Sequence, residues 1–218
     1  MGKIKQGILG GFSGKVGPVI GSSWKGKAIM RARALSVHNP NTDAQKEVRN
    51  KLTLVAKFIS KVNNAVKIGF KNYAVGMTAQ NAAVKLNLAE AVTGSGALLS
   101  LDWTKVKISR GELPNPKDPE AAASTGHKVT VSWTPNAGVT REALEGDHVM
   151  VVVYNATKKT ALFDESAERG SSSTEEVSVE FTHSADWASD SLQVFLFTYS
   201  DNGKLTSDTI RVGEVTAQ

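Results

Sequence analysis

Residues 21–28, which read Gly-Ser-Ser-Trp-Lys-Gly-Lys-Ala, have the spacing of a phosphate-binding loop, in which Gly-Lys follows a glycine after four residues. Such a loop needs Ser or Thr after the lysine, because that hydroxyl holds the Mg²⁺ ion of the nucleotide. Ala28 occupies this position, and the following residues alternate between apolar and basic types, which is typical of a strand. We therefore interpret this stretch as part of a β-hairpin that turns at Lys25 and Gly26.

Side chains for other kinds of chemistry are sparse. The chain has no cysteine, which excludes disulfides, thiolate metal sites and cysteine nucleophiles. The four histidines are scattered and form no His-x-x-x-His pair, so a zinc site is not expected. They are His38, His127, His148 and His183. We expect a protein that is not an enzyme, with no catalytic residue, no cofactor and no metal.

Charge is distributed unevenly along the chain. Residues 1–111 carry 18 Lys and Arg against four acidic residues, whereas residues 112–218 carry eight against 17. The resulting net charges of +14 and −9 are hidden in the overall value of +5. Such asymmetry indicates two domains with different partners, or copies that meet through oppositely charged ends.

A proline-rich segment separates the two halves. Residues 112–125 contain three of the six prolines and then a run of small residues, which is typical of a semi-stiff extended linker. We therefore predict a basic α+β domain at residues 1–111, a linker at 112–125 and an all-β domain at 126–218.

The start of the chain is rich in glycine, which disfavours a helix. We predict an irregular arm at residues 1–13 and a β-hairpin at residues 14–35. One side of the hairpin is expected to pack, and it holds Val16, Ile20, Trp24, Ala28 and Met30. The other side is our candidate binding or assembly face, made of Lys15, Lys25, Lys27, Arg31 and Arg33. Two interpretations of this face stay open: a solvated surface, or a groove for phosphate or for an acidic protein surface.

Two amphipathic helices are predicted next. Thr42 and Gln45 form a capping box, and apolar residues then recur every three or four positions as far as Gly69. A second helix is expected to begin at Thr78, to present a face of small residues and to stop at residues 93–96. Because small residues let helices approach closely, we expect the two helices to pack as a pair against the hairpin.

The acidic half has the pattern of an all-β fold. Residues 128–134 and 176–182 alternate between apolar and polar types, residues 148–155 and 191–199 are nearly continuous apolar runs, and Asn202-Gly203 is a strong hairpin signal. About seven short strands over roughly 100 residues indicate an antiparallel sandwich of the immunoglobulin or fibronectin type.

Several stretches resemble an uncharacterised family of proteins of similar length, found in bacteroidete genomes and associated mobile elements. They are MGKIKQGILGGFSGKVGPVIGSSWKGKAIMRARA at the start, NPNTDAQ at 39–45, Gly69-Phe70, and ISRGELP at 108–114. The resemblance covers most of the chain, and it implies a glycine-rich basic block followed by an immunoglobulin-like domain, without an activity or catalytic residues to transfer. The helix start Asn-Pro-x-Thr-x-x-Gln is also similar to short proteins of phage and prophage structural regions.

These features favour a non-enzymatic structural or assembly protein, such as a phage-related virion or surface-lattice component, that self-associates through its basic half and displays an immunoglobulin-like domain. The alternative is a nucleic-acid-binding module with an appended sandwich, although few aromatic residues of the basic half are available for base stacking. No apolar run reaches the roughly 18 residues that span a bilayer, and the start lacks the pattern of a secretion signal. We expect synthesis in the cytoplasm, formation of a homo-oligomer or larger assembly, and incorporation of that assembly into a virion or an extracellular structure.

Overall fold

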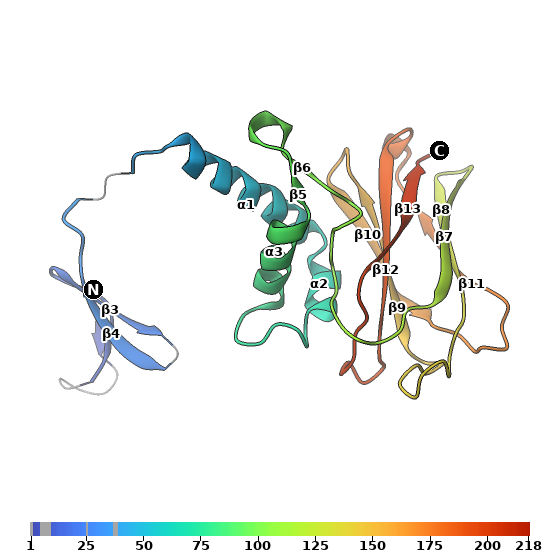
Figure 1. Cartoon of the computed structure of the whole chain (residues 1–218), viewed down its shortest axis with the longest axis horizontal. Helices are drawn as coiled ribbons and strands as arrows, with labels where there is room; N and C mark the ends of the chain where they lie inside the picture. Colours follow the sequence, from blue (N-terminus) through green and yellow to red (C-terminus); the bar gives the residue numbers. More distant parts are fainter. Residues whose placement is uncertain (1, 5–9, 25, 37–38) are drawn as a thin grey trace. The chain divides into compact units, whose positions relative to one another are not determined.

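The structure, a computed structural model, describes residues 2–4, 10–24, 26–36 and 39–218 (Figure 1). Over these residues the fold is mixed, with three α-helices and 13 strands in four antiparallel sheets. The chain forms two compact units, residues 1–42 and residues 43–218. Residues 1 and 5–9 of the predicted arm, and Lys25 of the candidate face, lie outside the described residues.

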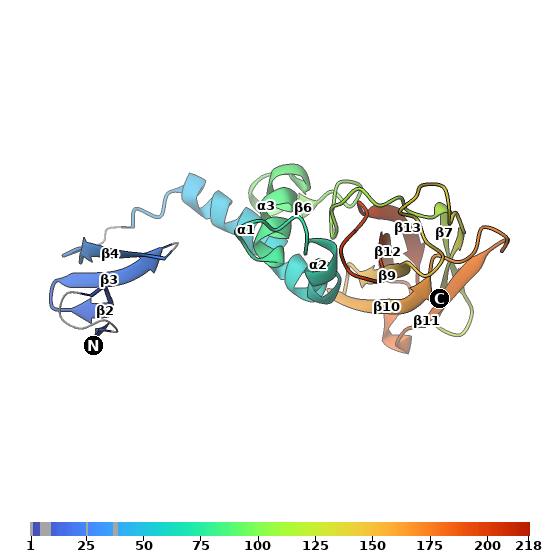
Figure 2. The same cartoon turned by 90° about the horizontal axis from the view of Figure 1, so that it is seen from below.

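The first unit is a sheet with the strand order β1-β2-β3-β4 (Figure 2). Its strands are β1 (Lys3–Ile4), β2 (Phe12–Val16), β3 (Val19–Trp24) and β4 (Lys27–Ala32). Tight turns join the last three strands, and Gly17 and Gly26 have φ angles of 54° and 78° there, a conformation that costs glycine little. The predicted hairpin is therefore present, and β2 extends it into the segment that we expected to be irregular.

The second unit begins with the predicted helices. They are α1 (Asp43–Lys61), α2 (Asn63–Gly69) and α3 (Ala79–Glu90). The first predicted helix starts directly after Thr42 and reaches Gly69, as expected, but it is interrupted at Val62, where φ of −99° and ψ of 20° leave the helical region. Thr78 caps α3 as expected, because its Oγ1 accepts a hydrogen bond from the backbone N–H of Asn81 at 3.2 Å.

Two larger sheets follow. One has the order β11-β8-β7, and the other has the order β10-β9-β12-β13. The strands of the first are β7 (Lys117–Ser124), β8 (Lys128–Thr134) and β11 (Val177–Thr182). Those of the second are β9 (His148–Asn155), β10 (Thr160–Glu168), β12 (Ser191–Tyr199) and β13 (Ile210–Thr216). The short strands β5 (Val92–Thr93) and β6 (Ser100–Leu101) pair with each other after α3.

Alternate residues of β9 belong to two different cores. Its odd-numbered valines pack with residues of β8, β11 and β12 in the space between the two larger sheets. Its even-numbered residues Met150, Val152 and Tyr154 pack on the opposite face with residues of all three helices. Successive side chains of a strand point to opposite faces. The β10-β9-β12-β13 sheet is therefore covered on both sides, by the helices on one and by the three-stranded sheet on the other (Figure 1).

This arrangement differs from the predicted domains. We expected the helices to pack against the N-terminal hairpin, whereas they cover the outer face of the four-stranded sheet within a single compact unit that extends from residue 43 to 218. Residues 117–124 of the predicted linker form β7 and pair with β8. Proline is tolerated there because β7 is an edge strand and Pro119 falls at a register shift between Lys117 and Glu120.

The stretches Gly69-Phe70 and 108–114, which carried part of the family resemblance, lie against each other. The N–H of Arg110 donates to the carbonyl of Gly69 at 3.0 Å. A Cβ added to Gly69 would lie 2.5 Å from the carbonyl oxygen of Ile108 and from Cβ of Ser109. Glycine is therefore required by the close approach of two backbones.

We predict that Gly69→Ala lowers the free energy of unfolding by roughly 1–3 kcal/mol, because the added methyl group forces the two backbones apart. Gly146→Ala is the matched control, since a Cβ at that position would meet no heavy atom within 4 Å. Urea denaturation followed by fluorescence measures both variants. Equal midpoints for the two variants would contradict the close approach.

A second prediction concerns the extent of the folding unit. A fragment of residues 43–218 should unfold cooperatively in urea, whereas a fragment of residues 126–218 should not. The shorter fragment lacks β7 and exposes the apolar outer face of β9 and β12. A cooperative transition of the shorter fragment at the midpoint of the longer one would show that the helices are dispensable for the fold.

Candidate functional site

The predicted basic face is only partly assembled. Lys15 of β2 and Arg31 of β4 are both paired with Ile20 of β3, and Lys27 is paired with Trp24 of β3. These basic residues therefore share one face of the N-terminal sheet. Arg33 follows the end of β4, where its backbone N–H donates to the carbonyl of Pro18 at 2.7 Å. The structure therefore brings three of the five predicted residues together on a face.

The same register corrects the predicted division of the two faces. We expected Ile20 and Trp24 on the packed side, but they lie among the basic residues. The reason is the turn between β3 and β4: a two-residue turn pairs even positions of one strand with odd positions of the next, so the parity of each face changes across it. The side chain of Trp24 is 62 % exposed on this basic face.

The opposite face of the sheet is apolar. Val16 and Val19 are paired with each other, as are Ile4 and Phe12, and Met30 is paired with Gly21. The members of this apolar face are Ile4, Phe12, Val16, Val19, Ala28 and Met30. A Cβ on Gly21 would lie 2.5 Å from a ring atom of Phe12, so the glycine leaves room for this ring over β3.

The first unit has no apolar core within its described residues. Gly21 is the one buried residue among them, and the larger apolar side chains are half-buried or exposed. Val16 and Met30 of the apolar face are 53 % and 68 % exposed. Small sheets are stable when a hydrophobic face packs against another element. The apolar face is therefore a surface suited to a partner.

The stretch that resembled a phosphate-binding loop has the backbone of two paired strands. Gly21 belongs to β3, and Lys27 opens β4 rather than a helix. Successive backbone amides of an extended strand point to opposite sides, so they cannot converge on a phosphate group. The hairpin interpretation of this stretch is confirmed.

Three ring pairs involve the scattered histidines, and in one of them His183 stacks on Trp187 with centroids 5.8 Å apart. The rings of His127 and His183 are 5.6 Å apart, and His148 stacks on Tyr199 at 5.1 Å. Within the described ranges, no group of three or more His, Asp or Glu side chains could hold a metal ion. In the same part of the chain, no helix is long and apolar enough to cross a membrane.

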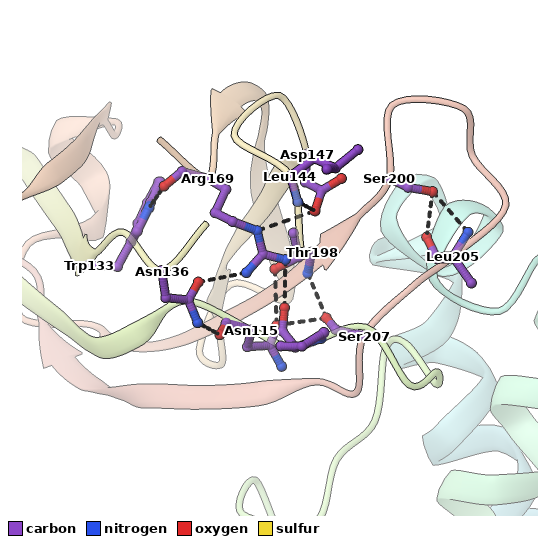
Figure 3. Close-up of polar contacts among 11 residues, drawn as sticks. Asn115, Trp133, Asn136, Leu144, Asp147, Arg169, Thr198, Ser200, Leu205 and Ser207 are labelled. Carbon is purple, nitrogen blue, oxygen red and sulfur yellow. Dashed lines mark hydrogen bonds and ion pairs between the residues drawn. The ribbon is translucent and has the colours of Figure 1, made fainter. Parts of the chain in front are cut away.

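The interior of the second unit contains a buried ion pair that no sequence pattern indicated (Figure 3). Arg169 follows β10 and Asp147 precedes β9, and their side chains are 0 % and 1 % exposed. The Nε of Arg169 donates to Oδ2 of Asp147 at 3.3 Å, and the N–H of Leu144 donates to the same oxygen at 2.9 Å. Burial lowers the pKa of Arg169, and the charge of Asp147 opposes this effect.

The ion pair extends into a network that fastens the predicted linker to the sheets. The Nη2 of Arg169 donates to the carbonyl of Pro114 at 2.7 Å, and its Nη1 donates to Oδ1 of Asn136 at 2.7 Å. Asn115 accepts hydrogen bonds from the hydroxyl groups of Ser207 and Thr198 (Figure 3). The network connects loops at one end of the sheets, which indicates a structural role.

We predict that Asp147→Ala lowers the free energy of unfolding by about 3–5 kcal/mol, because the guanidinium of Arg169 then stays buried without a compensating charge. Glu180→Ala removes the partner of Lys128 in an exposed pair of 2.7 Å, and it should cost less than about 1 kcal/mol. Urea denaturation measures both. Similar losses of unfolding free energy in the two variants would contradict the conclusion that Asp147 compensates a buried charge.

The comparisons with known proteins point to a family. No curated protein matches the chain. A model described as a family of unknown function (DUF6266) matches residues 11–213, which include most of the N-terminal sheet, the helices and nearly all of the two larger sheets. This confirms the resemblance to a family without an assigned activity. The chain belongs to the DUF6266 family of unknown function.

Proposed function

We propose that the protein is a non-enzymatic structural or assembly protein that self-associates through its N-terminal sheet, as a phage-related virion or surface-lattice component would. The observation that carries the proposal is the apolar face of this sheet, which has no buried apolar side chain among its described residues. Burial of apolar surface contributes about 25 cal/mol per Å², so covering this face on a second copy stabilises both the sheet and the assembly.

The edges of the sheet offer a second means of association. Among the described residues, β1 pairs only with β2 and β4 pairs only with β3. An edge strand presents unpaired backbone groups that can add a strand from another chain. Pairing of β4 with its counterpart on a neighbouring copy would extend the sheet at its edge, and a copy packed on the apolar face would cover that face.

The acidic half of the chain, residues 112–218, completes the proposal. We infer that residues 117–216 form a sandwich of the immunoglobulin or fibronectin type, because two antiparallel sheets share one core around Trp133. Exposed Glu165, Glu168, Glu175 and Glu176 lie on β10 and in the segment after it. Such a surface complements the basic face of a neighbouring copy, and the sandwich is displayed by the assembly.

Light scattering tests the assembly. We expect the full chain to form large particles at micromolar concentration, and Val16→Ser combined with Met30→Ser to abolish them while residues 43–218 stay folded, because the apolar face loses its burial. Val75→Ser combined with Leu98→Ser is the matched control, since these side chains are 83 % and 82 % exposed outside the N-terminal sheet. The proposal fails if the full chain stays monomeric.

The alternative, nucleic-acid binding, has one observation of its own. The exposed ring of Trp24 lies on the same face as Lys15, Lys27 and Arg31, and an aromatic ring among cations is the combination that binds single-stranded nucleic acid. This function requires that the basic face meets phosphates, whereas assembly depends mainly on the apolar face.

Salt dependence separates the two functions. If three cations contact phosphates, replacing Lys15, Lys27 and Arg31 by Gln should flatten the log–log salt slope of binding by roughly two to three units. We expect no tight binding of an oligonucleotide by the full chain at physiological salt, and particles that persist in moderate salt. Tight binding with that change of slope would favour the nucleic-acid module and contradict assembly through the apolar face.

A further inference from the structure

A pocket of about 450 Å³ opens in the second unit between the second half of α1, residues 100–103 and the end of β9. Its volume lies in the range of pockets for small organic molecules, roughly 300–1,000 Å³. Three aromatic rings line it, those of Phe58, Trp103 and Tyr154. All of its lining residues belong to the second unit, so the pocket does not depend on the N-terminal sheet.

The aromatic wall is held in place by its own packing. The ring of Phe58 meets the rings of Tyr154 and Trp103 edge to face, with centroids 5.1 and 5.7 Å away. Phe58 and Tyr154 are 2 % and 4 % exposed, because both also belong to the core between the helices and the four-stranded sheet. A wall fixed in this way needs no rearrangement to receive an apolar ligand, which lowers the entropic cost of binding.

The polar part of the lining is cationic. Lys57 and Lys61 lie one turn apart on α1, and Lys159 comes from the turn after β9. Lys159 has a φ of 57°, and its turn is fixed by Asn155, whose Oδ1 accepts hydrogen bonds from the N–H groups of Thr157 and Lys158. The lysine is therefore presented by an ordered turn rather than by a loose loop.

The charges of these three lysines are not compensated. Among the described residues, none of Lys57, Lys61 and Lys159 forms an ion pair. Other lysines of the unit do have acidic partners, namely Lys46, Lys51, Lys105, Lys128 and Lys158. The lining contains no acidic residue, so the cations repel one another and favour an anion at the mouth of the pocket.

We propose that this pocket binds an amphipathic organic carboxylate, with an aliphatic or aromatic body against the rings of Phe58, Trp103 and Tyr154 and the carboxylate between the lysines. The aromatic wall selects an apolar body, and the cations select a negative head group. Besides the lysines, the side-chain polar groups of the lining are the Tyr154 hydroxyl, the Trp103 indole N–H and the hydroxyls of Ser60 and Ser100. Both serine hydroxyls already take part in hydrogen bonds, with the carbonyl of Lys57 and the hydroxyl of Thr93, which leaves too few groups to satisfy a sugar or a nucleobase.

Binding of decanoate to the full chain tests the proposal, with decanol and decyltrimethylammonium as ligands of equal chain length and different charge. Titration calorimetry, below the micelle concentration of each ligand, measures the affinities. We expect decanoate to bind about tenfold or more tightly than decanol, and the cation to bind weakest. The preference for decanoate should shrink as salt is raised, because salt screens the lysines.

Two variants locate the site. Replacing Lys57, Lys61 and Lys159 by Gln should weaken decanoate binding about tenfold and leave decanol binding within about twofold. The matched control replaces Lys46, Lys51 and Lys128 by Gln, which removes the same charge away from the pocket and should change decanoate affinity little. Ala156→Phe places a ring in the pocket and should abolish binding of both ligands.

The outcomes are decisive in either direction. Equal affinity for decanoate and decanol, an equal effect of the two lysine triples, or no binding at millimolar decanoate would each overturn the carboxylate site. Failure here leaves assembly through the N-terminal sheet untouched, since that is measured by particle mass.

Discussion

The fold depends on the two central strands of the four-stranded sheet, β9 and β12, which are buried on both faces. Their backbone groups pair with each other and with β10 and β13, so no further hydrogen bonds are needed. What remains is two layers of apolar side chains, one on each face. Each layer must be covered, because an exposed face of this size favours aggregation. The three-stranded sheet covers one face and the helices cover the other.

This constraint explains why the helices and the sheets form one unit. Val55, Phe58 and Val62 of the helical region share one core with Met150 and Tyr154 of β9, so neither layer is complete alone. The segment between the layers is fixed in the same way. Pro114 is bound by the buried guanidinium of Arg169, and the N–H of Leu113 donates to the carbonyl of Thr206 at 2.9 Å. A stretch with the composition of a linker is thus part of the packed structure.

The N-terminal sheet differs from the larger sheets in how its faces are covered. It has one apolar and one basic face, but within its described residues it lacks the second layer that makes the larger sheets stable. The proposal of assembly follows from that deficit. The pocket beside Phe58 comes from the opposite situation, in which a covering layer of helices meets a sheet and leaves a space walled by rings and edged by lysines.

Local features were predictable because they depend on neighbours in the sequence. The helix start after Thr42, the cap at Thr78, the turn at Gly26 and the strands β8, β9, β11 and β12 all follow from spacing and residue type. The continuous apolar runs at 148–155 and 191–199 also indicate burial on both faces, since strands buried on one face alternate and strands buried on both do not.

Other features were decided by contacts between distant residues. The length of the turns between β2, β3 and β4 decides which residues pair across the N-terminal sheet. It places Ile20 beside Arg31, on the basic face rather than on the expected apolar face. The strand at 117–124 was hidden by Pro119, which is compatible with a sheet only because β7 lies at an edge. The sequence by itself determined most of the helices and strands, β7 excepted, and the alternation of apolar and polar positions along them. The tertiary structure alone decided which apolar sides meet, because that choice depends on the shape and area of surfaces that are brought together by the whole chain.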